Sequence, residues 1–420
     1  KQSRWPFETQ SEEVDMRILF ITDYLPYPAI SGDRIRNYSL IRRIAKQHQV
    51  SLVGFLQTPD EAGGGSHMQE FCHRVEVVNL RRRHKLVRVP GLLQYVLAGI
   101  PFDFEFLHSE VLTDRIRYLA SSPGFDIVQI EQTRMALYLE ALPTDINSKH
   151  ILVFHNIAAR QYDRISHIAL TPTKRMRAWL HGRMLRRWEP RYAERFDRCI
   201  TVSEVDRRLL VSANPRLKVD VVPNGVDTQM YQPLPLEGTQ PAVLLIGNMS
   251  YAPCADGAIW FCDRMLPHIR RAIGDVQVWI VGISPPSEVT RLGGDGVHVT
   301  GRVEDVVPYY RQSAVCVVPL RAGGGTRLKI LEAMALGRPV VSTAIGCEGL
   351  DIVNGKHLLT ADDPKKFAEK TVRLLTDRAL HQRIAAEARQ LVVTRYDWDV
   401  IARQLLAVYS EMVQEPELGK

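Results

Sequence analysis

Short apolar runs separated by longer amphipathic stretches dominate the chain. Continuous apolar runs of this length are typical of strands buried on both faces of a parallel sheet, and most of the intervening stretches have the period of helices. The pattern therefore predicts an α/β doubly wound sheet with both faces covered by helices. The strands expected in the first half are Arg17–Thr22, Gln49–Phe55, Val75–Val78, Ile127–Ile130, Ile151–Phe154, Arg198–Val202 and Val219–Val222.

A second series of the same kind follows a stretch rich in turn-forming residues. Pro223-Asn224-Gly225 leads into Pro233, Pro235 and Pro241, and this stretch is the best candidate for a domain boundary. We predict two Rossmann-like domains, residues 16–235 and 236–390, that face a central cleft where ligands lie at the carboxyl ends of the strands. The strands expected in the second series are Ala242–Ile246, Val276–Val281, Val297–Thr300, Ala314–Pro319 and Pro339–Thr343.

Both ends of the chain and one internal segment are interpreted separately. Residues 1–15 are expected to be a disordered leader or tag, because Met16 reads as a natural start that opens directly into a strand. The segment Gly63–Met68 resembles a linker with a protease-site scar, and it is either engineered or a native loop. From about Pro364 to Met412 the chain is predicted to be helical, with Ile401, Leu405, Leu406, Val408 and Tyr409 at helical spacing in the last helix.

Length and charge limit the possible classes of protein. The 420 residues suit two domains of about 200 residues each, and the net charge of +7 is modest for this length. Basic residues cluster in Arg81–Lys85 and in 174–198, where Trp179 and Trp188 are interspersed, so these segments are either solvated helix faces or contacts with an anionic membrane. We expect no nucleic-acid partner, because no nucleic-acid motif accompanies the charge.

The location of the protein is also constrained. No run of about 20 apolar residues and no secretory signal are found, so we expect a cytoplasmic protein, with peripheral contact at the inner face of the plasma membrane as the finer hypothesis. The six cysteines lack metal-ligand spacing and are expected to be small buried residues.

The segment Gly323–Ala335 carries the strongest chemical signal. Three consecutive glycines allow close approach of a ligand, and the predicted helix after them directs its positive end toward the same point. Arg327 and Lys329 add two cations in the first turn, which suits a diphosphate, and the Glu332 carboxylate is suited to accepting hydrogen bonds from ribose hydroxyls. The alternative is a flexible glycine loop before a core helix with solvated charges.

The stretch through Gly337–Thr343 resembles the donor-site signature of the GT-B retaining glycosyltransferases of the "family four", or group 1, type. Three further stretches, Asn224–Asp227, Ile246–Asn248 and Gly301–Asp305, fall in the order that the family has. Within the group, the chain is most similar to bacterial enzymes of exopolysaccharide and cell-surface glycan assembly. The resemblance implies that residues 391–415 form a helix that crosses back and packs on the first domain.

The resemblance also implies roles for individual residues. Lys329 and Arg327 would neutralise the leaving diphosphate, Glu332 would hold the ribose, and His155 would contact the transferred sugar. Arg36 is expected either to meet phosphate or acceptor or to be an ordinary helix-surface residue. The expected catalytic residues are therefore His155, Arg327, Lys329 and Glu332. The expected donor-binding residues are Gly247, Asn248, Arg302, Val303, Gly324, Gly325, Thr326 and Leu328, and the expected acceptor and phosphate loop contains Gly32, Asp33 and Arg36.

Two departures from the family pattern affect these expectations. The family commonly has two glutamates eight positions apart, and here Glu332 is the second while Gly324 occupies the first position, so the sugar is not identified. The loop after the first strand of the second domain often carries an Arg and a Lys, but Gly247–Tyr251 contains no cation. Arg327 is the expected substitute.

The expected activity is that of a metal-independent, retaining hexosyltransferase without a cofactor. It would move a sugar from a nucleotide diphosphate, UDP or GDP, to a glycan, lipid-linked or small-molecule acceptor. The only D-x-D string, Asp397-Trp398-Asp399, lies between predicted helices and reads as a helix cap or a solvated turn. The alternatives are a nucleotide-sugar epimerase or phosphorylase of the same architecture, and a non-catalytic relative that binds glycan or membrane.

Overall fold

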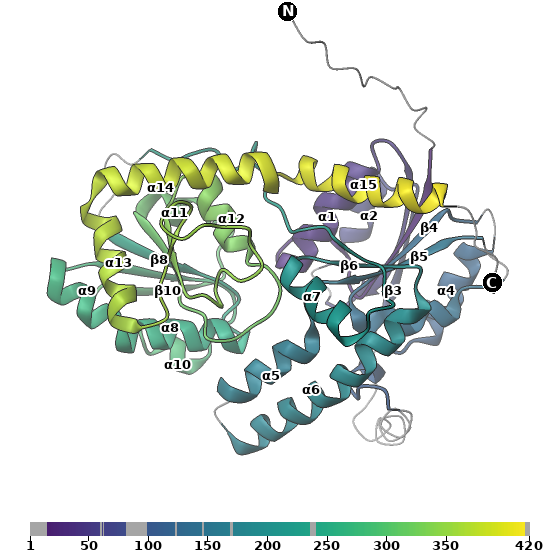
Figure 1. Cartoon of the computed structure of the whole chain (residues 1–420), viewed down its shortest axis with the longest axis horizontal. Helices are drawn as coiled ribbons and strands as arrows, with labels where there is room; N and C mark the ends of the chain where they lie inside the picture. The colour runs from purple at the N-terminus through teal and green to yellow at the C-terminus, as the bar shows by residue number, and fades with distance from the viewer. Residues whose placement is uncertain are drawn as a thin grey trace, which may run out of the picture.

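The computed structural model describes residues 15–58, 61, 63–80, 99–121, 124–144, 147–168, 171–235 and 241–415. In this part of the chain two lobes lie side by side, each built on a parallel sheet with helices on both faces (Figure 1). The first lobe has the strand order β3-β2-β1-β4-β5-β6-β7. Its strands are β1 (Arg17–Thr22), β2 (Gln49–Leu56), β3 (Arg74–Asn79), β4 (Ile127–Glu131), β5 (Lys149–Phe154), β6 (Arg198–Thr201) and β7 (Val219–Val221).

The sheet of the second lobe has the order β10-β9-β8-β11-β12-β13. Its strands are β8 (Ala242–Ile246), β9 (Gln277–Val281), β10 (Val297–Gly301), β11 (Val315–Val318), β12 (Val340–Ser342) and β13 (Leu359–Thr360). The predicted α/β class with two doubly wound sheets is confirmed, because all paired strands run parallel and the inner strands β1, β4, β8 and β11 are almost entirely buried. Strand β13 was not predicted, since two residues leave no apolar run to detect.

Helices cover both sheets. In the first lobe they are α1 (Gly32–Ile44), α2 (Gly64–Gln69), η3 (Phe104–Leu107), α4 (Glu110–Ala120), η4 (Thr133–Ala141), α5 (Ala158–Ile168), α6 (Pro172–Tyr192), η5 (Ala193–Arg195) and α7 (Glu204–Ala213). In the second lobe and beyond they are α8 (Ala252–Arg264), α9 (Leu266–Ile273), α10 (Ser287–Thr290), α11 (Val307–Gln312), α12 (Leu328–Ala335), α13 (Pro364–Thr376), α14 (Arg378–Leu391), η6 (Val392–Tyr396) and α15 (Trp398–Gln414).

The chain crosses between the lobes at two adjacent places. The second crossing brings α15 back beside α1, and its buried residues Ile401, Leu405 and Tyr409 join the core of the first lobe (Figure 1). At the crossing, the amide of Val226 donates to the carbonyl of Tyr396 at 2.7 Å, and the amide of Trp398 donates back to Val226. The Asp397 side chain caps α15 by accepting from the amide of Asp399, which confirms the helix cap expected for the D-x-D string.

The linker or loop conformation expected for Gly63–Met68 was wrong, and some other interpreted segments fall outside the described residues. The segment Gly63–Met68 is not a loose linker: α2 begins at Gly64, Met68 is fully buried, and the ring of His67 hydrogen-bonds to the hydroxyl of Tyr38 at 3.0 Å. A Cβ at Gly64 would lie 2.3 Å from the carbonyl oxygen of Tyr27, so the glycine is needed for this packing. Residues 1–14, the basic run 81–85 and most of 89–100 lie outside the described residues.

Helices α5 and α6 form an antiparallel pair that extends from the first lobe (Figure 1). The pair begins directly after β5, and it is anchored where Glu189 of α6 accepts the amide hydrogens of Ala158 and Ala159 at 3.0 and 3.2 Å. Trp188 near this base is buried, whereas Trp179, further along α6, is exposed. The two tryptophans of the basic segment therefore have different environments.

Candidate functional site

The glycine loop Gly323–Gly325 lies between β11 and α12 and touches the first lobe. Gly323 and Gly325 have φ values of 126° and 67°, which non-glycine residues rarely adopt. A Cβ at Gly325 would lie 2.5 Å from the carbonyl oxygen of His155, and one at Gly324 would lie 3.1 Å from the Cβ of Asn156. The glycines therefore allow the second lobe to approach the carboxyl end of β5 closely.

Arg327 folds back over this loop. Helix α12 begins at Leu328, so Arg327 is the N-cap residue and not part of the first turn, where we expected it. Its Nη1 donates to the carbonyl oxygens of Gly324 and Gly325, the latter at 2.7 Å. Its buried Nε and Nη2 atoms have no hydrogen-bond acceptor among the described residues. Burial lowers the pKa of this guanidinium, and an anion would supply the missing acceptors.

Lys329 lies in the first turn of α12, as expected. Its Nζ atom is 3.6 Å from Sγ of Cys254, and a Cβ at Gly247 would lie only 2.5 Å from that Nζ. Gly247 therefore leaves room for the ammonium group at the end of β8. A small, mostly apolar cavity lies beside it, lined by Lys329, Cys254 and Met249 among others.

Glu332 lies one turn further along α12 and is partly exposed. Burial of its carboxyl group raises the pKa, and the charge of Lys329 and a hydrogen bond with Tyr310 oppose this effect. The Tyr310 hydroxyl also donates to the carbonyl of Lys329 at 3.3 Å. Although the carboxyl group is buried, Glu332 as a residue is partly exposed, and its carboxylate remains able to accept hydrogen bonds from a ligand's hydroxyl groups.

The remaining predicted residues of the second lobe lie in segments that follow its strands. Arg302 and Val303 follow β10, with Arg302 exposed and Val303 partly buried. Asn248 follows β8, is exposed, and accepts the amide hydrogen of Ser250 at 2.9 Å. Thr326 accepts a hydrogen bond from the Asn224 side chain at 2.8 Å.

His155 lies at the end of β5 in the first lobe, next to the glycine loop. Its Nε2 atom is 2.6 Å from Oε2 of Glu131, which ends the neighbouring strand β4 and is fully buried. The next residue, Gln132, has a φ of 71°, an uncommon conformation for a non-glycine residue that marks strain at this strand end. Glu131 was not among the expected site residues, although a charged residue directly after the apolar run Ile127–Ile130 is a usable signal.

The predicted acceptor and phosphate loop divides into two environments. Gly32 is exposed, and a Cβ there would lie 3.3 Å from Leu328, so this loop faces the start of α12. The Asp33 carboxylate accepts from Ser31 and from the amide of Arg34. Burial alone would raise the pKa of Asp33, but hydrogen bonds from Ser31 and Tyr24 hold it below its usual value.

Of the two alternatives expected for Arg36, the helix-surface one was wrong. It is 1% exposed, and its Nη1 donates to the carbonyl of Pro223 at 2.6 Å and to Oδ1 of Asn224 at 3.0 Å. Because Asn224 in turn donates to Thr326, Arg36 supports the glycine loop through the segment between the lobes.

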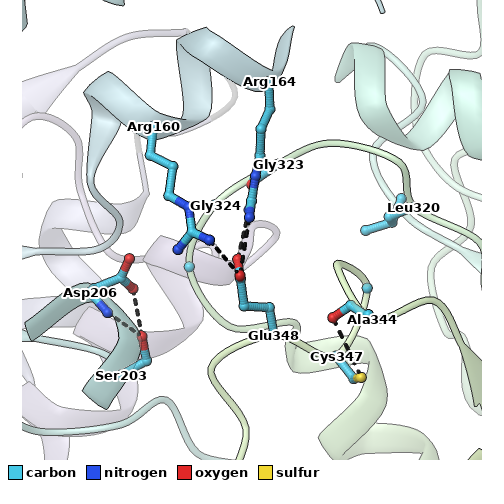
Figure 2. A network of polar contacts seen from close by, with 12 residues as sticks. Arg160, Arg164, Ser203, Asp206, Leu320, Gly323, Gly324, Ala344, Cys347 and Glu348 are labelled. Atoms are coloured by element: carbon cyan, nitrogen blue, oxygen red, sulfur yellow. Dashed lines mark hydrogen bonds and ion pairs between the residues drawn. The ribbon is translucent and has the colours of Figure 1, made fainter. Parts of the chain in front are cut away.

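Ion pairs between the two lobes form a second group that the sequence did not predict. Arg160 and Arg164 of α5 both bind the carboxylate of Glu348, with distances of 2.8 and 2.6 Å (Figure 2). Arg164 also donates to the carbonyl of Gly323 at 2.8 Å. Burial alone would raise the pKa of Glu348, yet the two arginines hold it below its usual value. These residues lie more than 150 positions apart, so no local pattern relates them.

Two other kinds of site, a metal site and a membrane span, are absent from the described residues. No group of three or more His, Cys, Asp or Glu side chains in this part of the chain is arranged to hold a metal ion. Among the described helices, none combines the length and the hydrophobicity needed to cross a membrane.

Comparison with known proteins identifies the family. Residues 34–230 match the model described as Glycosyltransferase Family 4, and residues 240–377 match the model described as Glycosyl transferases group 1. Together the two matches cover most of both lobes. The chain belongs to the GT-B glycosyltransferases of this family.

Individual relatives of this GT-B glycosyltransferase chain are distant. A phosphatidyl-myo-inositol mannosyltransferase of Mycobacterium leprae is 30% identical over 54% of this chain, and the match spans only 61% of the relative's length. A GDP-mannose-dependent α-(1-6)-phosphatidylinositol monomannoside mannosyltransferase of Mycobacterium tuberculosis is 26% identical over 68% of this chain and 83% of the relative. The structure of Anabaena HepE in complex with UDP-glucose shares the fold, with a TM-score of 0.68 and 16% identity over 94% of this chain and all of HepE.

Proposed function

We propose that this protein transfers a sugar from a nucleotide diphosphate donor to an acceptor hydroxyl group. The observation that carries the proposal is the pair of cations at the start of α12. Arg327 is buried with two nitrogen atoms that lack acceptors, and Lys329 is hydrogen-bonded only to a sulfur atom in the described part of the chain. A diphosphate at this helix N-terminus would satisfy both groups.

The proposed reaction breaks the bond between the anomeric carbon and the diphosphate oxygen. Negative charge grows on that oxygen as the bond breaks, and Arg327 and Lys329 stabilise it; a single interaction of this kind in an enclosed site is typically worth about 3–4 kcal/mol. The sugar passes through an oxocarbenium-like state. The acceptor hydroxyl attacks the face from which the diphosphate leaves and gives its proton to the departing diphosphate oxygen, so the anomeric configuration is retained. Close contact of the lobes at His155 and Gly325 limits the access of water.

The donor is a UDP- or GDP-sugar, and the reaction requires neither a metal ion nor a cofactor. One relative is named as GDP-mannose-dependent, and HepE was solved with UDP-glucose, so hexoses on these two nucleotides are the first candidates. The acceptor is a glycan, a lipid-linked molecule or a small molecule. The names of both mycobacterial relatives refer to phosphatidylinositol-derived acceptors, which favours a lipid-linked acceptor.

A panel of UDP-, GDP-, ADP- and dTDP-sugars, measured by thermal shift and calorimetry in EDTA, tests the proposal. We expect one nucleotide to stabilise the protein by about 2.7 kcal/mol at a concentration of one hundred times Kd. Lys329→Ala should abolish this effect and the transfer of radiolabelled sugar. Lys356→Ala, at a half-exposed lysine of the same lobe, is the matched control and should change neither.

Three outcomes would contradict the proposal. Binding without transfer or donor hydrolysis would favour a non-catalytic relative, consistent with Gly324 at the position of the family's first glutamate. Epimerised donor, or sugar release that requires inorganic phosphate, would favour an epimerase or a phosphorylase. Binding that disappears in EDTA would contradict the metal-independent mechanism.

We also propose that the protein works in the cytoplasm at an anionic membrane surface, which α6 contacts. Near its free end this helix exposes Met176, Trp179 and Leu180 at fractions of 63%, 45% and 49%. These residues follow one another at helical spacing, and Arg183 continues the stripe with its guanidinium over the Trp179 ring. Exposed apolar side chains next to arginines fit the boundary between acyl chains and anionic headgroups.

Vesicle flotation tests this contact. The wild type should float with vesicles of phosphatidylglycerol and phosphatidylcholine, and much less with phosphatidylcholine alone or at high salt. The double variant Trp179→Ser, Leu180→Ser should lose flotation. Met230→Ser, at a 73% exposed methionine in the segment between the lobes, should float like the wild type. Equal flotation of the wild type and the double variant would contradict the proposal.

A further inference from the structure

A chain of buried hydrogen bonds leads from His155 to the last helix of the protein. Oε2 of Glu131 is 2.6 Å from Nε2 of His155, and Oε1 of Glu131 accepts from the Gln129 side chain at 2.6 Å. The Tyr409 hydroxyl of α15 donates to Oε1 of Gln129, also at 2.6 Å. Glu131 and Tyr409 are fully buried, and Gln129 is 1% exposed. No proposed step of the reaction uses this arrangement.

Strand register explains why these groups meet. Gln129 and Glu131 are two positions apart on β4, so their side chains lie on the same face of the sheet. Glu131 pairs with Val153 on β5, which places it beside the end of β5 and therefore beside His155. Tyr409 reaches this face because α15 returns to pack beside α1 (Figure 1).

Glu131 is ionised despite its burial. Burial alone would raise its pKa, but the hydrogen bond and charge of His155, together with the charge of Arg36, hold the pKa below its usual value. An ionised carboxylate only accepts hydrogen bonds, so Nε2 of His155 carries a hydrogen that points toward Glu131. The other ring nitrogen, Nδ1, is then left to interact with a ligand.

His155 lies where the two lobes meet. The carbonyl of the same residue, His155, approaches the glycine loop so closely that Gly325 has no room for a side chain. The Arg327 guanidinium in turn donates a hydrogen bond to the carbonyl of Gly325 in the glycine loop. A ring with a fixed orientation at this point lies beside the groups proposed to bind the donor.

We infer that Glu131 is a positioning residue for the sugar-transfer reaction: its buried carboxylate fixes the orientation and the Nε2–H tautomer of His155, so that Nδ1 is presented to a hydroxyl group of the transferred sugar. The inference rests on the proposed function. Gln129 and Tyr409 keep the carboxylate in place, so α15 supports the site from behind. Similar carboxylate partners orient histidines at many enzyme sites.

A double-mutant cycle on turnover tests the inference. Glu131→Gln keeps the size of the side chain and removes its charge; we expect kcat to fall by about 10- to 100-fold, with little change in nucleotide affinity. His155→Ala should cause at least as large a loss. Adding Glu131→Gln to His155→Ala should then change kcat by less than twofold, because Glu131 acts through a ring that is no longer present.

Two further measurements separate positioning from a structural role. Proton NMR of the wild type should show a strongly deshielded imidazole N–H signal that His155→Ala removes and Glu131→Gln weakens; this readout does not depend on activity. Tyr409→Phe, which breaks only the outer end of the chain, should lower the melting temperature but retain most of kcat. If neither the wild type nor Glu131→Gln transfers sugar, the proposed function fails, but the NMR signal still tests the contact between Glu131 and His155. Full kcat in Glu131→Gln, or an equal loss in the His155→Ala background, would overturn the inference.

Discussion

The side-chain amide of Asn224 donates a hydrogen bond to the hydroxyl of Thr326 at 2.8 Å, and this bond ties the segment between the lobes to the glycine loop. Asn224 is 8% exposed and is held on its other side by Arg36. The position of the loop therefore depends on residues of both lobes, and the two cations that we propose to bind the diphosphate, Arg327 and Lys329, follow the loop at the start of α12.

Thr326→Val should weaken donor binding. The substitution keeps the shape of the side chain but removes the acceptor for the Asn224 amide, and leaving a buried donor unsatisfied costs about 1–3 kcal/mol. We expect nucleotide-sugar affinity, measured by calorimetry, to fall about fivefold or more. Thr376→Val, at an exposed threonine that bonds only within α13, is the control and should leave the affinity unchanged. Unchanged affinity in Thr326→Val would show that the bond does not support the loop.

Gly325→Ala should impair turnover more than stability. Gly325 and Gly355 both have positive φ values, 67° and 82°, but only Gly325 faces a neighbour, the carbonyl oxygen of His155. Alanine at either position should cost about 1–2 kcal/mol in the free energy of unfolding. Only Gly325→Ala should also reduce kcat, by more than tenfold, because it separates the lobes. Equal kcat in the two variants would show that this close contact is not needed for turnover.

Removal of the Glu348 charge should open the lobes. Its carboxylate pairs with Arg160 and Arg164 of the other lobe. The lowered pKa means that this pairing stabilises the contact between the lobes above pH 4.5, the usual value, and is lost as the pH falls through the lowered value. Glu348→Gln should increase the radius of gyration in X-ray scattering at neutral pH and weaken donor binding several-fold. Glu204→Gln, which breaks exposed pairs on α7, is the control.

Glu189 should make stability depend on pH. It is 1% exposed, and burial raises its pKa to about 7, above its usual value of 4.5. A carboxyl group with a raised pKa contributes stability that is fully present below pH 4.5 and is lost as the pH rises through 7. We expect Glu189→Gln to reduce the loss of unfolding free energy between these pH values, by about 3 kcal/mol at most. Urea unfolding of the wild type and Glu189→Gln at several pH values measures this difference. The same pH dependence in both proteins would contradict the raised pKa of Glu189.

The fold was largely predictable because buried parallel strands leave continuous apolar runs in the sequence. The same signal fails for β13, which is too short, and for α2, whose glycines suggest a linker although they pack against Tyr27 and Val77. Lys329 was correctly expected in the first turn of α12, because Gly-rich loops before helices have a local pattern.

Other parts of the site depend on contacts that no local pattern reveals. Arg36 looks like a surface arginine until the segment at Asn224 is folded over it. Glu131 approaches His155 only through the register of β4 and β5, and Glu348 approaches Arg164 only when the lobes meet. Contacts of this kind depend on how the strands and lobes are arranged, so they are found only in the folded structure.

The return of α15 has a consequence for how the protein is made. The same core that contains Leu40 of α1 is completed by Ile401, Leu405, Tyr409 and Met412, although more than 360 residues separate them from Leu40 along the chain. During synthesis, the first lobe therefore emerges from the ribosome with one wall of its interior missing, and it stays incomplete until nearly the whole second lobe has been translated. Until α15 is made, the apolar surface that it covers stays exposed. During this interval a nascent chain of this design is most accessible to chaperones and most prone to aggregation.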